Sequence, residues 1–69
     1  MKLSARNILK GKIIQIKAGA VNSEIVLELP GGAQIVSIIT KESAENLGLA
    51  VGKTAYAVVK ASSVMIAVD

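Results

Sequence analysis

The 69-residue sequence contains no cysteine and no histidine. The absence of cysteine excludes disulfides and is weakly typical of a reducing compartment, and the absence of both residues excludes ordinary zinc sites. It also removes the usual general bases and thiol nucleophiles of enzymes. A domain of this size buries only about 60% of its unfolded surface and is marginal alone. Oligomerisation is therefore the expected source of additional stability.

Aromatic residues are almost as scarce, since Tyr56 is the only one. Proteins that bind single-stranded nucleic acid stack the bases on aromatic rings, so one tyrosine argues against that function. The formal net charge of +3 indicates a modest preference for anions. Eight basic residues offset by five acidic ones do not form the dense basic face of a nucleic-acid binder.

Long apolar runs are also missing. No stretch approaches the roughly 20 apolar residues that a membrane-spanning helix needs. Residues 1–12 are charged and contain no continuous apolar segment, so we do not expect a signal peptide. Cytoplasm is the expected location.

Hydrophobic residues nevertheless make up 52% of the chain, and their spacing predicts one domain over residues 1–69. Alternating and β-branched segments, separated by Gly- and Pro-containing turns, predict five strands. Gly11, inside the first strand, suggests a bulge or a bend. The predicted strands cover residues 8–17, 21–29, 33–39, 54–59 and 63–68.

One helix is predicted over residues 40–47. Thr40 is a good N-cap, Glu42 lies in the first turn, and Gly48 is typical of the C′ position. Ala44 and Leu47 are expected to share its buried face. A five-stranded barrel with a helix between the third and fourth strands is the OB-fold arrangement. An SH3-like barrel is the alternative, but it lacks a helix at that position.

Two segments, Val36–Ile39 and Val64–Val68, are apolar on both faces of the predicted strand. One face can fill the barrel, whereas the other needs a cover that a single small domain does not supply. A second subunit is the expected cover.

Hydrogen-bond donors gather in three places: Ser4–Asn7, Thr40–Ser43 and Lys60–Ser63. A helix N-terminus offers unpaired N–H groups, arginine offers a forked contact, and lysine offers a point charge. We hypothesise that the three clusters converge on one small oxyanion, with a second copy of the chain supplying part of the site. The alternative for each is structural: helix capping, solvated surface charge, or turn residues.

Catalysis is a weaker alternative. Glu24 and Glu28 lie four apart along one strand, too far to act as a close pair, and a solvated strand face explains them. Ser62 beside Lys60 would be a conceivable nucleophile and base. The sequence therefore favours a binding protein over an enzyme.

The candidate oxyanion site contains donors without a necessary acceptor. Phosphate at neutral pH retains a proton and favours a site with an acceptor. A fully deprotonated tetrahedral dianion, such as molybdate, tungstate or sulfate, is satisfied by donors alone.

Several motifs together closely resemble the molbindins, the small Mop-type molybdate-binding proteins of the TOBE-like domain family. The similarity covers essentially the whole chain. The motifs that carry it are Ser4-Ala5-Arg6-Asn7, Lys10-Gly11-Lys12, Gly19-Ala20-Val21-Asn22-Ser23-Glu24, Thr40-Lys41-Glu42-Ser43-Ala44, Leu47-Gly48-Leu49 and Lys60-Ala61-Ser62-Ser63-Val64-Met65.

The resemblance implies an OB-like barrel and a homohexamer, a trimer of dimers, that stores molybdate or tungstate between subunits. It implies bound oxyanion as the cofactor, with no free metal cation. A pterin is not expected because the chain has no cluster of stacking aromatic residues, and neither a membrane nor a nucleic-acid partner is expected, for the reasons given above. The implied oxyanion contacts are Ser4, Ala5, Arg6, Thr40, Ser43, Lys60, Ala61 and Ser62, of which Ala5 and Ala61 contribute backbone N–H groups. A possible second site comprises Gly19, Ala20, Val21, Asn22 and Ser23.

Two other function classes remain open from the sequence. An OB-fold module could bind single-stranded nucleic acid, although the stacking aromatics are missing. A structural assembly module without a ligand would form the same oligomer, but its stability would not depend on anions.

Overall fold

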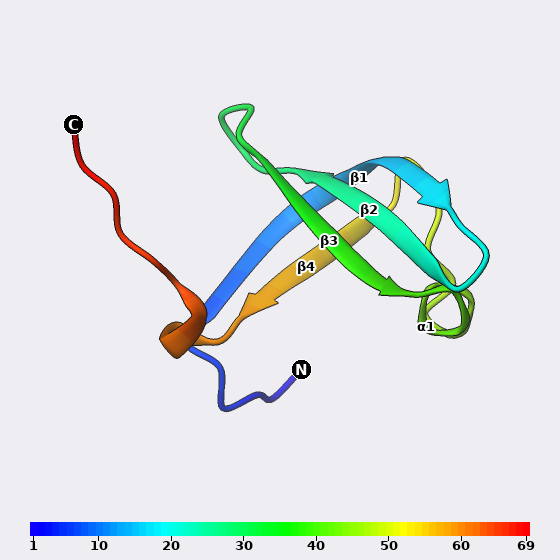
Figure 1. Ribbon diagram of the computed structural model, residues 1–69, viewed down its shortest axis with the longest axis horizontal. Coiled ribbons are helices and arrows are strands. Elements are labelled where there is room, and N and C mark those ends of the chain that lie inside the picture. Colours follow the sequence, from blue (N-terminus) through cyan, green and yellow to red (C-terminus); the bar gives the residue numbers. More distant parts are fainter.

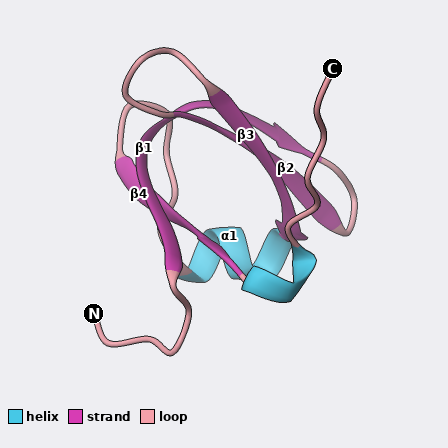
Figure 2. Ribbon diagram, turned by 90° about the vertical axis from the view of Figure 1, so that its left-hand side faces the viewer, coloured by secondary structure: helices cyan, strands magenta, loops and turns pink.

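The computed structural model describes residues 1–69 as a small, strongly curled antiparallel sheet with one short α-helix (Figure 1). The strands are hydrogen-bonded in the order β3-β2-β1-β4. Figure 2, turned by 90°, shows the sheet curving into an incomplete barrel. The elements are β1 (Asn7–Ala18), β2 (Asn22–Glu28), β3 (Gln34–Thr40), α1 (Lys41–Asn46), β4 (Thr54–Val59) and the 3-10 turn η1 (Ala61–Ser63).

The longest strand, β1, joins the two halves of the sheet. Its first half pairs with β4, from Asn7↔Val59 to Lys12↔Thr54, and its second half pairs with β2. The predicted irregularity is present but lies elsewhere, because the register shifts between Ile13 and Gln15. Gly11 instead permits a close approach of strands, since a Cβ there would lie 2.9 Å from the carbonyl oxygen of Glu28.

The core is small. Ile13 from β1 and Ile25 and Leu27 from β2 form its buried centre. Partly buried residues from β3, β4 and the loop after α1 pack around them. In the strand predicted over residues 21–29, Ile25 and Leu27 are therefore buried on one face, and Val26 on the opposite face is also buried.

Turn chemistry follows the sequence signals. The amide of Gly19 donates to the carbonyl of Asn22 at 2.8 Å, which closes the β1–β2 turn. Gly31 and Gly32 have φ values of 93° and 95° in the β2–β3 hairpin, a region that L-residues with a Cβ rarely adopt.

Helix α1 begins and ends as the sequence predicts. The Oγ1 atom of Thr40 accepts a hydrogen bond from the amide of Ser43 at 3.0 Å, which makes Thr40 the N-cap. Gly48 has φ 63°, and the amides of Gly48 and Leu49 donate back to Glu45 and Ala44. This bonding pattern is the Schellman motif. Ala44 is half-buried, whereas Leu47 is exposed, contrary to the prediction for this face.

The predicted fifth strand is wrong for the single chain. Residues 64–69 form no strand, and Met65, Ile66 and Val68 are 92%, 86% and 91% exposed. The segment leaves η1 and runs away from the sheet (Figure 1). An apolar, β-branched run favours a strand only where a neighbour supplies hydrogen-bond partners, and the chain's own sheet does not supply them here. The single chain therefore has a four-stranded open barrel instead of the predicted five-stranded one.

Neither helical segment has the length and apolar character needed to cross a bilayer.

Candidate oxyanion site

The sheet register places two of the three donor clusters at the same end of the molecule. Asn7 at the start of β1 pairs with Val59 at the end of β4. Ser4–Arg6 directly precede β1, and Lys60–Ser62 directly follow β4, so both segments leave the sheet at this end. We call this pair of segments the terminal donor cluster.

The turn η1 shapes the second half of the terminal donor cluster. Lys60, in an extended conformation at φ −64° and ψ 128°, is its N-cap residue. The carbonyl of Lys60 accepts from the amide of Ser63 at 2.9 Å. The first amides of a 3-10 turn have no acceptor inside the turn, which leaves those of Ala61 and Ser62 as candidate donors.

The two cations of this cluster are available to a ligand. Both Arg6 and Lys60 are exposed. The hydrogen bonds that side chains make in the structure join Thr40 to Ser43 and Lys53 to Gly48, so neither cation is engaged. Ser4 and Ser62 are also exposed, and Ala5 is half-buried. The guanidinium of Arg6, the ammonium of Lys60 and the hydroxyls of Ser4 and Ser62 thus lie at one end of the sheet.

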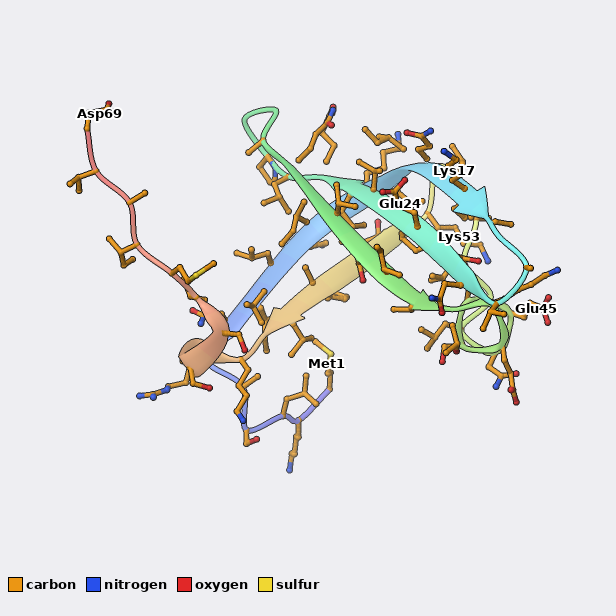
Figure 3. All side chains as sticks on the ribbon, in the orientation of Figure 1. Met1, Lys17, Glu24, Glu45, Lys53 and Asp69 are labelled. Carbon is orange, nitrogen blue, oxygen red and sulfur yellow. The ribbon has the colours of Figure 1, made fainter.

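The third donor cluster lies at the other end. Ala18 at the end of β1 pairs with Ser23, and Asn22 pairs with Thr40 at the end of β3. This register places Thr40 and Ser43 at the end of β1 opposite to Arg6. The strand β1, which runs between the two ends, is 12 residues long. Figure 3 shows Lys17, near the end of β1, and Glu45 of α1 on the same side of the molecule, whereas Asp69 at the C-terminus lies on the other side.

The geometry therefore divides the predicted site. One chain places Ser4–Arg6 and Lys60–Ser62 at the same end of the sheet but leaves Thr40 and Ser43 at the other end. A site that uses all three clusters needs Thr40 and Ser43 from a second copy.

Thr40 and Ser43 form the N-terminal cap of α1, which is the structural alternative to ligand binding. The Thr40 hydroxyl accepts from the Ser43 amide and donates to Ser43 Oγ at 2.8 Å. With the Thr40 proton committed to Ser43 Oγ, the hydroxyl proton of Ser43 is left for an external acceptor. Both residues are exposed, so capping and ligand contact are compatible at Ser43.

The candidate second site lies beside this helix start. The amide of Lys41 donates to the carbonyl of Val21 at 2.8 Å, which ties residues 19–23 to α1. Gly19, Ala20, Val21 and Asn22 are exposed. Ser23, however, is only 2% exposed, so its hydroxyl is poorly placed for an ion that approaches the single chain from solvent.

The acidic residues support the solvated-face interpretation instead of a catalytic pair. Glu24 pairs across the sheet with Lys17, and Glu28 pairs with Lys12. Opposite charges directly across an antiparallel pair are a stabilising combination of strand surfaces. Groups of three or more acidic side chains that could hold a cation are absent.

A feature that the sequence did not identify is an apolar groove of about 610 Å³ on the concave side of the sheet. Its walls are the inner faces of β3 and β4, and its floor includes Ile25 and Leu27 of β2. The apolar residues of β3 and β4 that line the groove are visible in the sequence. They could not be assigned to a groove, because the sequence does not show that β3 and β4 are the two edges of the sheet.

Comparisons with known proteins place the whole chain in one family. Residues 3–66 match the model of the TOBE domain. The chain is 52% identical over 66 residues to molybdenum-pterin-binding protein 2 of Clostridium pasteurianum, covering 96% of this chain and 97% of that protein.

Two solved structures share the fold. MopII from Clostridium pasteurianum superposes with a TM-score of 0.93 at 49% identity, covering 97% of this chain and 100% of MopII. The cytoplasmic molybdate-binding protein ModG, with molybdate bound, gives a TM-score of 0.85 at 52% identity, over 88% of this chain and 43% of ModG. The chain therefore belongs to the TOBE domain family, and within it to the small Mop-type proteins that it matches along its length.

Proposed function

We propose that this protein binds and stores molybdate, or the similar dianion tungstate, in the cytoplasm, at sites formed between subunits of a homo-oligomer. The observation that carries the proposal is the terminal donor cluster, in which Arg6 and Lys60 are exposed, unengaged and at the same end of the sheet. ModG, which shares the fold at 52% identity, is described as a cytoplasmic molybdate-binding protein.

The chemistry of the donor set supports a fully deprotonated tetrahedral anion. Arginine and lysine donate without accepting, and backbone amides do the same. Charge-assisted hydrogen bonds of this kind are about twice as strong as neutral ones. A ligand that carries its own proton, such as hydrogen phosphate, would leave that proton without an acceptor. Binding, and not catalysis, is the use that these groups suggest.

The separation of the clusters supports a shared site. Thr40 and Ser43 lie at the end of β1 opposite to Arg6, so one copy would present Ser4, Arg6, Lys60 and Ser62 while another presents Thr40 and Ser43. Backbone amides of Ala5 and Ala61 would complete the first set. By family resemblance we take the assembly to be a hexamer, a trimer of dimers, with Gly19–Ser23 near a second type of site.

A pterin ligand is named for the relative from Clostridium pasteurianum. In this chain the only aromatic ring is that of Tyr56 on β4, and its neighbours across the sheet include Lys10 instead of another ring. A flat pterin ring would gain stacking from one side at most. We therefore propose the bare oxyanion as the ligand.

Isothermal titration of the purified protein with sodium molybdate tests this function. We expect saturable binding of molybdate, competition by tungstate, and weaker or no binding of sulfate and phosphate. Because each chain would supply one terminal donor cluster and one Thr40–Ser43 pair, shared main sites predict about one molybdate ion per chain, and any further ions would belong to the second type of site. Absence of any molybdate heat, together with binding of a short single-stranded oligonucleotide, would replace the proposal with the nucleic-acid function.

The site assignment is tested separately with Arg6→Ala and Lys60→Ala. Each variant should lose about 1.5–3 kcal/mol of binding free energy, because one hydrogen bond to a charged group disappears. Lys12→Ala is the matched control, since it removes the same charge from an exposed position in the middle of β1. Equal affinity of all three variants and the wild type would refute the terminal donor cluster as the site.

A further inference from the structure

Charge is distributed unevenly along the chain. Residues 1–23 contain five basic residues and no acidic one, and residues 46–68 contain two more, again without an acid. The first stretch includes β1 and the second includes β4, and these two strands are neighbours in the sheet. Four of the five acids, in contrast, lie on β2 and α1. The β1–β4 side of the molecule is therefore basic, although the net charge of the whole chain is only +3.

The lysines of β1 differ in their neighbours across the sheet. Lys12 and Lys17 each lie opposite a glutamate of β2, so a carboxylate partly offsets each of these charges. Lys10 lies opposite Tyr56 of β4, and the pairing of β1 with β2 begins only at Lys12. Lys10 is exposed, and its side chain takes part in none of the side-chain hydrogen bonds of the structure. Its charge therefore acts on an ion that approaches from solvent.

Lys10 and one further lysine flank the terminal donor cluster. Lys10 follows Arg6 by four positions, and Lys2 precedes Arg6 by the same number. A fully extended stretch of four residues spans about 14 Å, so the Cα atom of neither lysine can lie farther than this from the Cα atom of Arg6. Lys2 is exposed and free of side-chain hydrogen bonds, as Lys10 is. We call Lys2 and Lys10 the flanking lysines.

A charge at this distance affects a bound dianion without contact. By Coulomb's law in water, one unit charge at about 14 Å raises the affinity for a dianion roughly threefold before screening. The Debye length is about 30 Å in 0.01 M salt and about 3 Å in 1 M salt, so much of this gain remains in dilute salt and almost none in concentrated salt. A surface of one charge sign also raises the local concentration of an oppositely charged ligand.

We propose that the flanking lysines, Lys2 and Lys10, attract molybdate to the terminal donor cluster through their electrostatic field and raise its affinity without contacting it. This role depends on the proposed function of the cluster. Because the attraction scales with the charge of the ligand, it favours a dianion over the monovalent anions that compete in solution. Arg6 and Lys60 hold the ion, whereas the flanking lysines increase its capture from dilute solution.

Charge reversal at both positions tests this role by titration calorimetry with molybdate. The double variant Lys2→Glu/Lys10→Glu should weaken binding about five- to tenfold in about 20 mM monovalent salt, and by less than about 1.5-fold in about 0.5 M salt. Lys2→Arg/Lys10→Arg is the matched control, since it keeps both charges and should bind like the wild type at both salt concentrations. Arg6→Ala, which removes a contact, should lose at least about tenfold at both.

Sedimentation velocity checks that each variant assembles like the wild type. Lys2→Gln/Lys10→Gln replaces the reversal if glutamates disturb the assembly, and it should weaken binding about two- to threefold in dilute salt. Unchanged affinity in dilute salt would overturn the role of the flanking lysines and leave the molybdate site in place. A loss that persists in about 0.5 M salt would also overturn it, because it would indicate contact with the ion or a structural role. Absence of molybdate binding by the wild type would overturn the proposed function, and this role with it.

Discussion

At the residue scale, Gly11 is the position where a single atom decides the packing of two strands. A Cβ there would lie 2.9 Å from the carbonyl oxygen of Glu28 and 3.1 Å from Cδ2 of Leu29. The Leu29 side chain can move aside, but the Glu28 carbonyl is backbone. Gly11 also lies beside Lys12, where β1 ends its pairing with β4 and begins its pairing with β2.

We therefore expect Gly11→Ala to lower the free energy of unfolding by about 1–3 kcal/mol, the usual cost of overpacking. Denaturant titration at one fixed protein concentration measures it. Lys10→Ala, a neighbouring exposed position, is the control and should change the stability by no more than about 0.5 kcal/mol. A Gly11→Ala variant as stable as the wild type would mean that β1 and β2 separate easily here.

At the scale of elements, Thr40 has two roles that mutation can separate. Its hydroxyl caps α1 by accepting from the Ser43 amide, and the same region is proposed to contact the oxyanion. Thr40→Val removes the cap and should lower the free energy of unfolding by about 1 kcal/mol. Thr40→Asp keeps an N-cap acceptor and so should keep the stability, while its negative charge repels a dianion.

The expected pattern is thus loss of molybdate affinity in Thr40→Asp without loss of stability, measured by titration calorimetry and thermal unfolding. Thr40→Ser, which retains a hydroxyl, should behave like the wild type in both measurements. Unchanged affinity in Thr40→Asp would remove Thr40 from the site and leave it as a cap alone.

At this scale, the features that the sequence predicts correctly are those whose hydrogen-bond partners are local. The N-cap Thr40, the C′ residue Gly48 and the turn glycines Gly31 and Gly32 were interpretable because their hydrogen-bond partners lie within five residues. The register shift near Ile13 was misplaced at Gly11, since a glycine serves a bend and a close strand approach equally well.

Non-local features could not be predicted in the same way. Residues 63–68 have the composition of a strand, but composition does not say which chain supplies the neighbouring strand. The candidate site residues were likewise identified by type and motif, whereas their division between the two ends of β1 depends on the order β3-β2-β1-β4. Pairing order is a property of the sheet, which the linear pattern of donors does not contain.

At the scale of the whole molecule, the buried core is too small to explain a stable single chain. Four hydrophobic side chains are buried, and sixteen large ones remain exposed. A core of this size leaves little free energy after the conformational entropy cost of folding. The stability of the protein is therefore expected to depend on association between copies. This dependence is expected both for an oxyanion store and for a ligand-free assembly module, and for any size of oligomer.

Ligand-linked stability does distinguish the store from the assembly module. A ligand that binds only the folded assembly stabilises it by about 2.7 kcal/mol when its concentration is 100 times Kd. We expect molybdate to raise the midpoint of thermal unfolding, and phosphate at equal ionic strength to leave it unchanged. Arg6→Ala should abolish the molybdate-dependent rise while keeping the dependence of the midpoint on protein concentration. A midpoint that depends on concentration but not on molybdate would identify an assembly module without this ligand.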